Sequence, residues 1–394
     1  MARAPVLLWL AVFTLIISSP QACRAEDEEA VVYKKPLSEW LGTLKSDKVE
    51  KNRRAALIAV GEVGLRSRKV VPAVAAALRQ DESATVREAA AQMLGRLAFK
   101  ATDLLPEANG AVRVALIEDR KQALEALMEA LRGDKVAKVR TASGTGLGRL
   151  GPDAAPAVAA LTAALKDNDD TTRAAAAEAL GRIGRDATEA VPALLDCLKD
   201  KKADRFVRIF AAFALGRTEG DSAVVVPALS ETVADSDSLP DVRKSAAEAL
   251  GQIGRSAADS VPVLVRILTK EPTKQTVEVR RAAAAALDRI HPDAKSVLPD
   301  LKGALKDEDK FVRSQVLHVL GRLGSEGTEA VPDVIQRLKD DQVLEVRLAA
   351  IEALGALGVN SKEVIEALNA ASRSSIAGVR DAAKEALKKL QADQ

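Results

Sequence analysis

Apolar residues recur along most of the chain at a helical spacing, in two kinds of segment that alternate. In the first kind an apolar run accompanies a proline, as in VPALLDCLKD at 191–200. In the second kind, small and aliphatic residues stand at −1, +2, +3, +6, +7 and +10 from an arginine, as in VRKSAAEALG at 242–251. At about 100° per residue these positions share one broad face of an α-helix. The pattern predicts pairs of amphipathic helices, with +1 and +5 of the second helix turned outward and +9 at the edge.

The arginine of the second segment marks an internal repeat. It recurs at 53, 87, 140, 173, 208, 243, 280, 313, 347 and 380, with spacings of 33 to 37 residues apart from one gap of 53. Helix pairs that repeat at this period cannot bury both faces alone, so they stack on their neighbours. We expect an all-α fold, an α-α superhelix formed as a right-handed solenoid of about ten two-helix repeats.

Proline and glycine mark where the predicted helices begin and end. Proline suits a first helical turn because its missing N–H needs no partner there. The expected openers are Pro72, Pro192, Pro227, Pro262, Pro299 and Pro332. Glycine at +8 is expected to close the main part of the second helix in eight repeats. Glycine at +11 permits the left-handed turn that ends the helix in several of them.

The third repeat, at about residues 99–150, departs from this pattern. Its register is lost for about twenty residues after Pro106, and its second helix holds Gly144 and Gly146 in the interior. Each interior glycine costs about 1 kcal/mol relative to alanine. The sequence predicts that this repeat is softer than the others.

The repeated strings resemble the HEAT-repeat family, specifically its short bacterial branch named after phycobilisome lyases. The likeness rests on continuous strings such as VRKSAAEALGQIG at 242–254 and on the helix opener AVPALL at 190–195. It extends over residues 37–394. The resemblance implies a stacked-helix fold. It also implies a binding scaffold, although a few members of the family are lyases or hydroxylases.

The first residues predict an export signal. Arg3 precedes an apolar run, Val6 to Ile17, that is too short to span a bilayer comfortably, and small residues stand before position 26. We expect a signal peptide at 1–25, a linker at 26–36, and a periplasmic or extracellular location. No other apolar run is long enough for a membrane helix.

A lipid anchor at Cys23 is the alternative to a free exported chain. The preceding Pro20-Gln21-Ala22 is a poor context for that modification. After cleavage only Cys197 remains, so no internal disulfide can form.

The charge of the expected mature chain is balanced. The leader holds Arg3 and Arg24, two of the 58 basic residues, and none of the 56 acidic ones, which leaves 56 of each. Zero net charge and export both disfavour a nucleic-acid partner.

Aspartate stands six residues before the repeat arginine in seven repeats. Residues present in nearly every repeat are expected to hold repeats together, the carboxylate capping the second helix or pairing with an arginine across the stack. We therefore predict a structural ladder rather than a catalytic array. Its members are Asp81, Arg87, Asp134, Arg140, Asp167, Arg173, Asp307, Arg313, Asp341 and Arg347.

The sequence offers no catalytic or metal-binding constellation. GLGRLG at 146–151 matches a phosphate-binding pattern but follows no strand. His291 replaces a helix-ending glycine and His318 is isolated, so the metal sites of the related hydroxylases cannot form. Cys197, beside leucines, is expected to be a buried, inert thiol. No cofactor is implied.

The outward positions +1 and +5 of the second helices are expected to be mostly polar, and one repeat departs from this. Phe213 holds a +5 position and Ile209 the +1 position of the same repeat. Exposed apolar clusters mark partner sites, so these two residues predict a docking patch unless a local tilt buries them. Phe206 and Phe210 in the same stretch are expected to pack in the interior.

Position +9 of the second helices adds charge beside this patch, since seven of the ten residues at that position are basic. The candidates for partner binding are Ile209, Phe213, Arg149, Arg182, Arg217 and Arg322. We expect an exported, non-enzymatic scaffold that binds another macromolecule, a protein, on a concave face lined by the second helices. The alternatives are a lyase-like enzyme or enzyme subunit and a reader of extracellular polysaccharide, which usually recruits exposed Trp and Tyr.

Overall fold

The computed structural model describes residues 30–270 and 276–392, and most of them are helical. The expected leader, with Cys23, lies outside the described residues. The first helices of the pairs are α1 (Leu37–Ser46), α3 (Val70–Gln80), α5 (Gly110–Gly133), α7 (Val158–Ala164), α9 (Val191–Lys199), α11 (Ser222–Ala234), α13 (Val261–Lys270), α15 (Ala294–Ala304), α17 (Val331–Asp340) and α19 (Lys362–Ala371). The second helices are α2 (Glu50–Val63), α4 (Ala84–Leu104), α6 (Ala137–Arg149), α8 (Asp170–Ile183), α10 (Arg205–Leu215), α12 (Pro240–Ile253), α14 (Val277–Ile290), α16 (Lys310–Arg322), α18 (Leu344–Leu357) and α20 (Ala377–Ala392).

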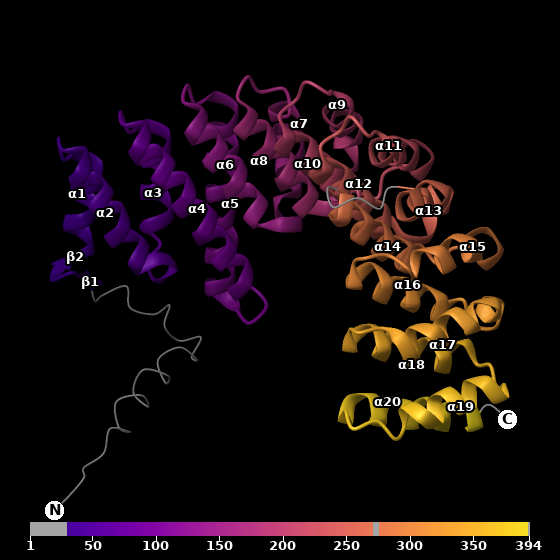
Figure 1. Ribbon diagram of the computed structural model, residues 1–394. Helices are drawn as coiled ribbons and strands as arrows, with labels where there is room; N and C mark the ends of the chain where they lie inside the picture. Colours follow the sequence, from indigo (N-terminus) through magenta and orange to yellow (C-terminus); the bar gives the residue numbers. More distant parts are fainter. Residues whose placement is uncertain (1–29, 271–275, 393–394) are drawn as a thin grey trace, which may run out of the picture. The chain divides into compact units, whose positions relative to one another are not determined.

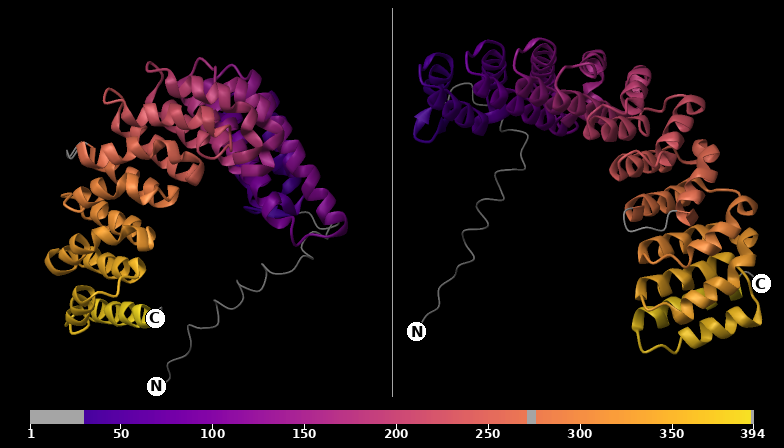
Figure 2. Two further views of the ribbon diagram at one scale, coloured as in Figure 1. Left: turned by 90° about the vertical axis from the view of Figure 1, so that its right-hand side faces the viewer. Right: turned by 45° about the horizontal axis from the view of Figure 1, so that its top comes forward.

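The chain divides into two compact units, residues 1–179 and 180–394, with the division inside α8. Within each unit the pairs stack in chain order (Figure 1, Figure 2). First helices pack on first helices, as α3 does on α5, and second helices on second helices, as α12 does on α14. The all-α superhelix of two-helix repeats is therefore confirmed.

A short hairpin precedes the first helix pair. Strands β1 (Val31–Val32) and β2 (Lys35–Pro36) pair antiparallel, with Tyr33 and Lys34 at positive φ in the turn. Trp40 on α1 donates a hydrogen bond from Nε1 to the Val32 carbonyl at 2.9 Å. The hairpin is thereby attached to the first repeat.

The positive φ that the predicted turn at +11 requires is present, and Gly358 and His291 have the left-handed helical conformation. Glycines at this position have φ between 55° and 78°, and they are Gly64, Gly151, Gly184, Gly254, Gly324 and Gly358. His291 and Glu219 hold the same position in their repeats with φ of 57° and 50°. His291 therefore replaces a helix-ending glycine in the left-handed conformation.

The prediction that glycine at +8 closes the second helix is wrong in most repeats. Gly251 lies inside α12 and Gly321 inside α16, and only Gly216 stands at a helix end. A Cβ atom at Gly251 would lie 2.9 Å from Ala286 Cα, and one at Gly216 would lie 2.8 Å from Ala249 Cα. At Gly216 and Gly251 glycine is needed because the next second helix approaches so closely that no side chain fits.

Two of the prolines expected to open first helices lie inside them instead. Pro227 is inside α11 and Pro299 inside α15. Asp221 and Asp293 cap these helices about one turn earlier, accepting from the N–H groups of Ala223 and Ser296. These caps start each helix before its proline. In α9, α13 and α17, by contrast, the proline follows the first helical residue.

The additional residues of the irregular stretch at 99–150 lengthen two helices. α4, the second helix of the preceding repeat, has 21 residues, and α5 has 24. Gly146, an interior glycine of α6, has a packing role, because a Cβ atom at Gly95 of α4 would lie 2.6 Å from its Cα. The two backbones touch at this point. That this repeat is softer than the others stays a prediction.

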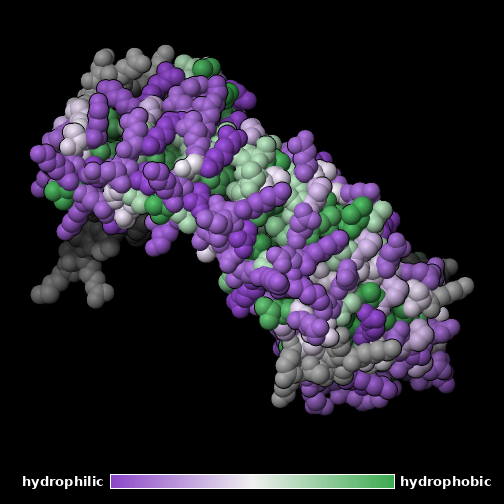
Figure 3. All heavy atoms as spheres, turned by 90° about the horizontal axis from the view of Figure 1, so that it is seen from above, coloured by the Kyte–Doolittle hydropathy of each residue, from purple (hydrophilic) through white to green (hydrophobic). Residues whose placement is uncertain are grey.

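The core consists of alanine, leucine and valine side chains between the two layers of each unit. The face in Figure 3 carries hydrophilic residues over most of its area, with hydrophobic residues in small, separate areas. Within the described residues, no helix has the length and apolar character needed to cross a membrane.

Asp119 is a buried carboxyl group on α5, with 8% of its surface exposed. Burial raises its pKa to about 6, against the attraction of Arg68 and with the repulsion of Glu118. A raised pKa means that the folded state holds the proton more tightly than the unfolded state. The proton on Asp119 therefore stabilises the folded state fully below about pH 4, the unfolded pKa. This stabilisation is lost as the pH rises through about 6.

Asp119→Asn is therefore expected to stabilise the protein at pH 7 and leave its stability unchanged at pH 4. The gain should be about 1 kcal/mol, since one pKa unit is worth about 1.4 kcal/mol and the amide keeps part of the burial cost. Urea unfolding of parent and variant at both pH values measures it. An equal gain at pH 4 would show that the carboxyl group does not titrate in this range.

Candidate functional site

Arginine–aspartate pairs connect successive repeats within each unit. Arg53 meets Asp81 through Nε–Oδ2 and Nη2–Oδ1 contacts of 2.8 Å each. Two-point pairs of the same kind join the following residues: Arg87 with Asp134, Arg140 with Asp167, Arg280 with Asp307 and Arg313 with Asp341. Each arginine lies on one second helix and each aspartate precedes the next.

The sequence suggested that the aspartate binds the free N–H groups of the second helix, and this prediction is wrong. Asp81 Oδ1 accepts from the N–H of Ser83, which is itself the cap of α4 and accepts from Thr85. Arg87 donates from Nη1 to the Asp81 carbonyl at 2.9 Å. Each aspartate thus fixes the loop before the second helix, because its side chain and carbonyl bind groups on both sides.

The pairing is not continuous. Arg208 donates to Ser238 Oγ at 3.0 Å, although Asp237 stands six residues before Arg243. Where the −6 aspartate is missing, Arg173 pairs with Asp170 of its own helix and donates to the Asp167 carbonyl. The residue six before Arg380 is Ser374, and the Nε of Arg347 is buried without a hydrogen-bond partner among the described residues. Of the ladder residues predicted, Arg173 and Arg347 therefore lack an aspartate partner in the next repeat, among the contacts of the described residues.

The ladder carboxyl groups are stabilised in the ionised form. Burial opposes ionisation of Asp134, but hydrogen bonds from Arg87 and the Val136 N–H outweigh it and lower the pKa. The same balance, with Arg313 and Val343, lowers the pKa of Asp341. A lowered folded-state pKa stabilises the fold above about pH 4, and this stabilisation is lost as the pH falls through the lowered value. These ion pairs thus join neighbouring repeats, and their structural role stays a prediction.

A groove of about 480 Å³ crosses α10, α12 and α14 in the second unit, and we call it the central groove. Its floor is formed by Gly251 and by alanines, since the close helix approach described above leaves no room for larger side chains. Its lining residues are Phe213, Arg217, Lys244, Ser245, Glu248, Ala249, Gly251, Gln252, Glu278, Arg281, Ala282, Ala285, Ala286 and Arg289.

Phe213 forms one wall of the central groove. Its ring occupies the space over Gly181, where a Cβ atom would lie 2.6 Å from the ring. The ring remains half-exposed. Arg217 lies over it, with 5.4 Å between guanidinium carbon and ring centroid, and donates from Nε to the Gly181 carbonyl at 2.8 Å. Phe213 is therefore held in place while one side still faces the groove.

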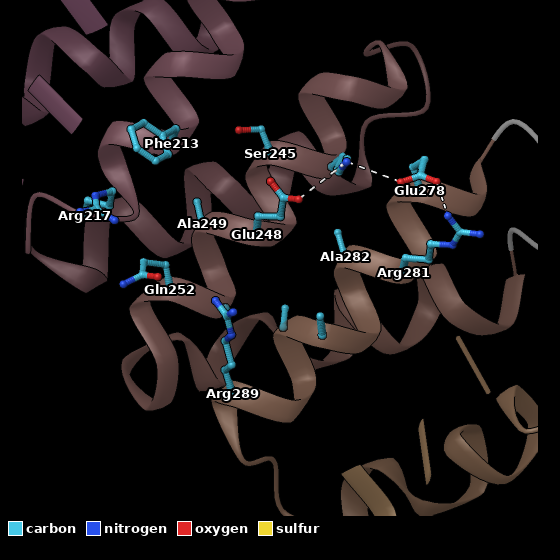
Figure 4. Close-up of a pocket in the computed structure, with 14 residues that line it drawn as sticks. Phe213, Arg217, Ser245, Glu248, Ala249, Gln252, Glu278, Arg281, Ala282 and Arg289 are labelled. Atoms are coloured by element: carbon cyan, nitrogen blue, oxygen red, sulfur yellow. Dashed lines mark hydrogen bonds and ion pairs between the residues drawn. The ribbon is translucent and has the colours of Figure 1, made fainter. Parts of the chain in front are cut away.

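The two ends of the central groove differ in charge. At one end Glu278 is 3.5 Å from Lys244 Nζ and 2.6 Å from Arg281 Nη1, and Arg281 also pairs with Asp309 at 2.6 Å. The other end holds Arg217, Gln252 and Arg289 (Figure 4). Among the described residues, Arg289 has neither an ion pair nor a hydrogen bond, and its side chain is exposed. This end therefore presents positive charge and an amide beside the Phe213 ring.

The structure brings only part of the predicted partner set together. Phe213 and Arg217 line the central groove, whereas Ile209 is half-buried outside it and its carbonyl accepts from Ser245. Arg149 and Arg182 are exposed on α6 and α8. Arg322 is 2.9 Å from Asp288 and is also in contact with His291, so its charge is used within the protein.

Two predictions about burial are wrong, those for Phe206 and Cys197. Phe206 is 46% exposed, and Phe311, which holds the same −2 position in another second helix, is 53% exposed. Guanidinium groups cover part of both rings, Arg205 over Phe206 and Arg281 over Phe311. Cys197 is half-exposed because its neighbouring leucines take the core side of α9.

Several groove residues were missed by the sequence interpretation. Glu278 stands at −2, and Lys244 and Arg281 at +1. Positions −2, +1, +5 and +9 follow the helical period and share one face. Including −2 in the outward face would have found Glu278 and predicted the exposure of Phe206 and Phe311.

The groove contains no paired nucleophile and base. Ser245 is buried and bonded to the Ile209 carbonyl, and no histidine or cysteine is among the described lining residues. In the described ranges, no three His, Cys, Asp or Glu side chains are placed to hold a metal ion.

Comparisons with known families agree with the repeat pattern. A family model described as HEAT repeats matches residues 37–110, 124–206, 201–277 and 273–355. A second, described as a PBS lyase HEAT-like repeat, matches residues 346–374. No curated protein matches the chain.

Solved structures share this fold at low sequence identity. A crystal structure of an engineered protein has a TM-score of 0.54 at 20% identity, over 90% of this chain and 98% of that one. Importin beta has a TM-score of 0.58 at 16% identity, over 90% of this chain and 52% of that one. The karyopherin Kap121p, bound to the extreme C-terminus of the protein phosphatase Cdc14p, has a TM-score of 0.50 at 15% identity, over 90% and 41%. This chain thus spans 52% of the length of importin beta and 41% of the length of Kap121p, and the likeness concerns the fold alone.

Proposed function

The chain belongs to the HEAT-repeat family, and from this premise we propose that it is a non-enzymatic scaffold that binds an acidic, partly apolar protein segment in the central groove. The karyopherin with this fold holds the end of another protein, which supports a protein partner here. The observation that carries the proposal is the pairing of the half-exposed Phe213 ring with the cationic end of the groove.

The chemistry of this end selects the ligand. The Phe213 ring offers an apolar surface, and aromatic and arginine side chains dominate binding energy at protein interfaces. Arg217 and Arg289 offer guanidinium groups that bind carboxylates in two-point geometry. An acidic side chain next to an apolar one satisfies both features.

Selection from a library of random peptides tests this proposal. Peptides retained by residues 26–394 should be enriched in Asp and Glu next to an apolar residue. The double variant Phe213→Ser, Arg289→Ser should lose this enrichment, since it removes the ring and the unpaired cation. Helical circular dichroism establishes that the variant is folded.

A matched variant keeps the result interpretable. Arg255→Ser, Arg266→Ser removes two exposed cations from η6 (Gly254–Ser260) and α13 of the same unit, away from the groove lining. It should retain the acidic, apolar peptides. Loss of enrichment in this variant too would mean that net charge, rather than the central groove, selects the ligand.

We propose further that the protein acts outside the cytoplasm, in the periplasm or the extracellular space. The support is the apolar run at residues 6–17 with small residues before position 26. Recovery from cells of a chain whose intact mass still includes residues 1–25 would contradict this proposal.

The alternative, a lyase-like enzyme, has one supporting observation, the PBS lyase HEAT-like match over residues 346–374. That match covers a single repeat of stacked helices and coincides with no cluster of reactive groups among the described residues.

A further inference from the structure

A second groove lies in the first unit, across α4, α6 and the first turn of α8, and we call it the N-terminal groove. Its volume is about 640 Å³. It occupies the same kind of place as the central groove, between successive second helices, but its lining is different. Ala142 is the one aliphatic side chain among its described lining residues, and threonine hydroxyls and a glutamine amide supply much of the rest.

The cations of this groove are not neutralised within the protein. Arg96, Lys138 and Arg149 line it, and none of them forms an ion pair among the described residues. Arg96 has only a weak contact with the Met93 sulfur at 3.7 Å. The groove holds one carboxylate, Glu88, which accepts a long hydrogen bond from Gln92. Three cations against one carboxylate leave an excess of positive charge.

The two guanidinium groups belong to helices whose backbones touch. Arg96 follows Gly95 on α4, and Arg149 holds the same +9 position on α6, which meets α4 at Gly95 and Gly146. Packed helix axes lie about 8–10 Å apart, and this contact indicates the short end of that range. Like charges on neighbouring helices repel each other. An anionic ligand would remove the repulsion, which gives the groove a preference for anions.

We propose that the N-terminal groove binds an acidic protein segment in the polyproline II conformation, with carboxylates three residues apart. This conformation has three residues per turn and rises about 3.1 Å per residue, so every third side chain returns to the same side after about 9 Å. That repeat falls within the general range of about 8–10 Å for packed helices. Carboxylates at i and i+3 reach Arg149 and Arg96, while Thr145 and Gln92 bind the backbone between them. Thr141 and Thr171 are hydrogen-bonded to each other. No apolar anchor is required, in contrast to the central groove.

Two peptides of identical composition test the spacing. One repeats Glu-Pro-Pro, and the other collects the same glutamates in one block followed by the prolines. Fluorescence anisotropy with residues 26–394 at low salt should show that the spaced peptide binds at least tenfold more tightly than the block peptide. Equal affinity for the two, tighter binding of the block peptide, or no binding of either would overturn the proposal.

Variants locate the binding. Arg96→Ser, Arg149→Ser should abolish the preference for the spaced peptide. Lys121→Ser, Arg132→Ser removes two exposed cations from α5, away from the groove lining, and should preserve it. If Arg217→Ser, Arg289→Ser keeps the preference for the spaced peptide, this site is separate from the central groove. If that variant loses the preference, the peptide binds in the central groove and the proposal is overturned. A polyuronic saccharide that displaces the spaced peptide at lower concentration than the unlabelled peptide would identify a carbohydrate ligand and contradict a protein one.

Discussion

Replacement of Asp307 by alanine is expected to lower the free energy of unfolding of the second unit by about 3 kcal/mol. Breaking a buried ion pair from one side costs about 3–5 kcal/mol because the other charge stays buried without its partner. Arg280 is fully buried and contacts Asp307 at 2.8 and 3.1 Å. The low end of the range applies because Glu308 remains 3.8 Å from the guanidinium.

Urea unfolding followed by circular dichroism measures this loss, with hydrogen exchange in α14 and α16 to localise it, since stacked repeats can unfold in parts. The double variant Arg280→Met, Asp307→Asn removes both charges and keeps an acceptor for the Asp309 N–H. Its loss in the free energy of unfolding should be less than half the loss of Asp307→Ala. Glu345→Ala, which breaks an exposed pair with Lys310, should change stability by less than about 0.5 kcal/mol. A loss that small for Asp307→Ala would refute the structural role of the ladder.

Gly95→Ala is expected to lower the free energy of unfolding of the first unit by about 2 kcal/mol. Its Cβ atom would lie 2.6 Å from the Gly146 backbone, so α4 and α6 must move apart. Overpacking of this kind costs about 1–3 kcal/mol and exceeds the gain of up to about 1 kcal/mol that alanine brings to a helix.

Gly61→Ala is the matched control, since it holds the same +8 position on α2. Its Cβ atom would meet only the end of the flexible Met93 side chain, which can turn aside. The change in stability should be within about 0.5 kcal/mol of zero, because the side-chain adjustment and the helix preference offset each other. Urea unfolding of both variants measures the two changes. Equal losses in the free energy of unfolding would mean that the close helix contact at Gly95 does not cause the loss there.

The helix pairs and the +11 turn were predictable because each depends on a few neighbouring residues. The period of the apolar positions identified the second helices, and the left-handed turn at His291 followed from its place in the repeat. The role of glycine at +8 was not predictable locally, because it depends on how closely the next helix approaches. The same holds for Pro227, where a cap at Asp221 starts the helix earlier.

The candidate site was predictable only in part. The +5 and +9 positions led to Phe213 and Arg217 because both lie on one helix face. The sequence could not show that Ile209 turns away, or that Arg322 is paired with Asp288 while Arg289 is left unpaired among the described residues. These differences arise between helices, and a single-repeat pattern does not contain them.

The most direct test of the central claim is a fluorescence anisotropy titration of one acidic, apolar peptide from the library selection. The account predicts that Arg217→Ser, Arg289→Ser weakens its binding at least tenfold, while Arg255→Ser, Arg266→Ser changes the dissociation constant less than twofold. Equal weakening by the two double variants would contradict the central groove as the binding site and reduce the interaction to general charge attraction.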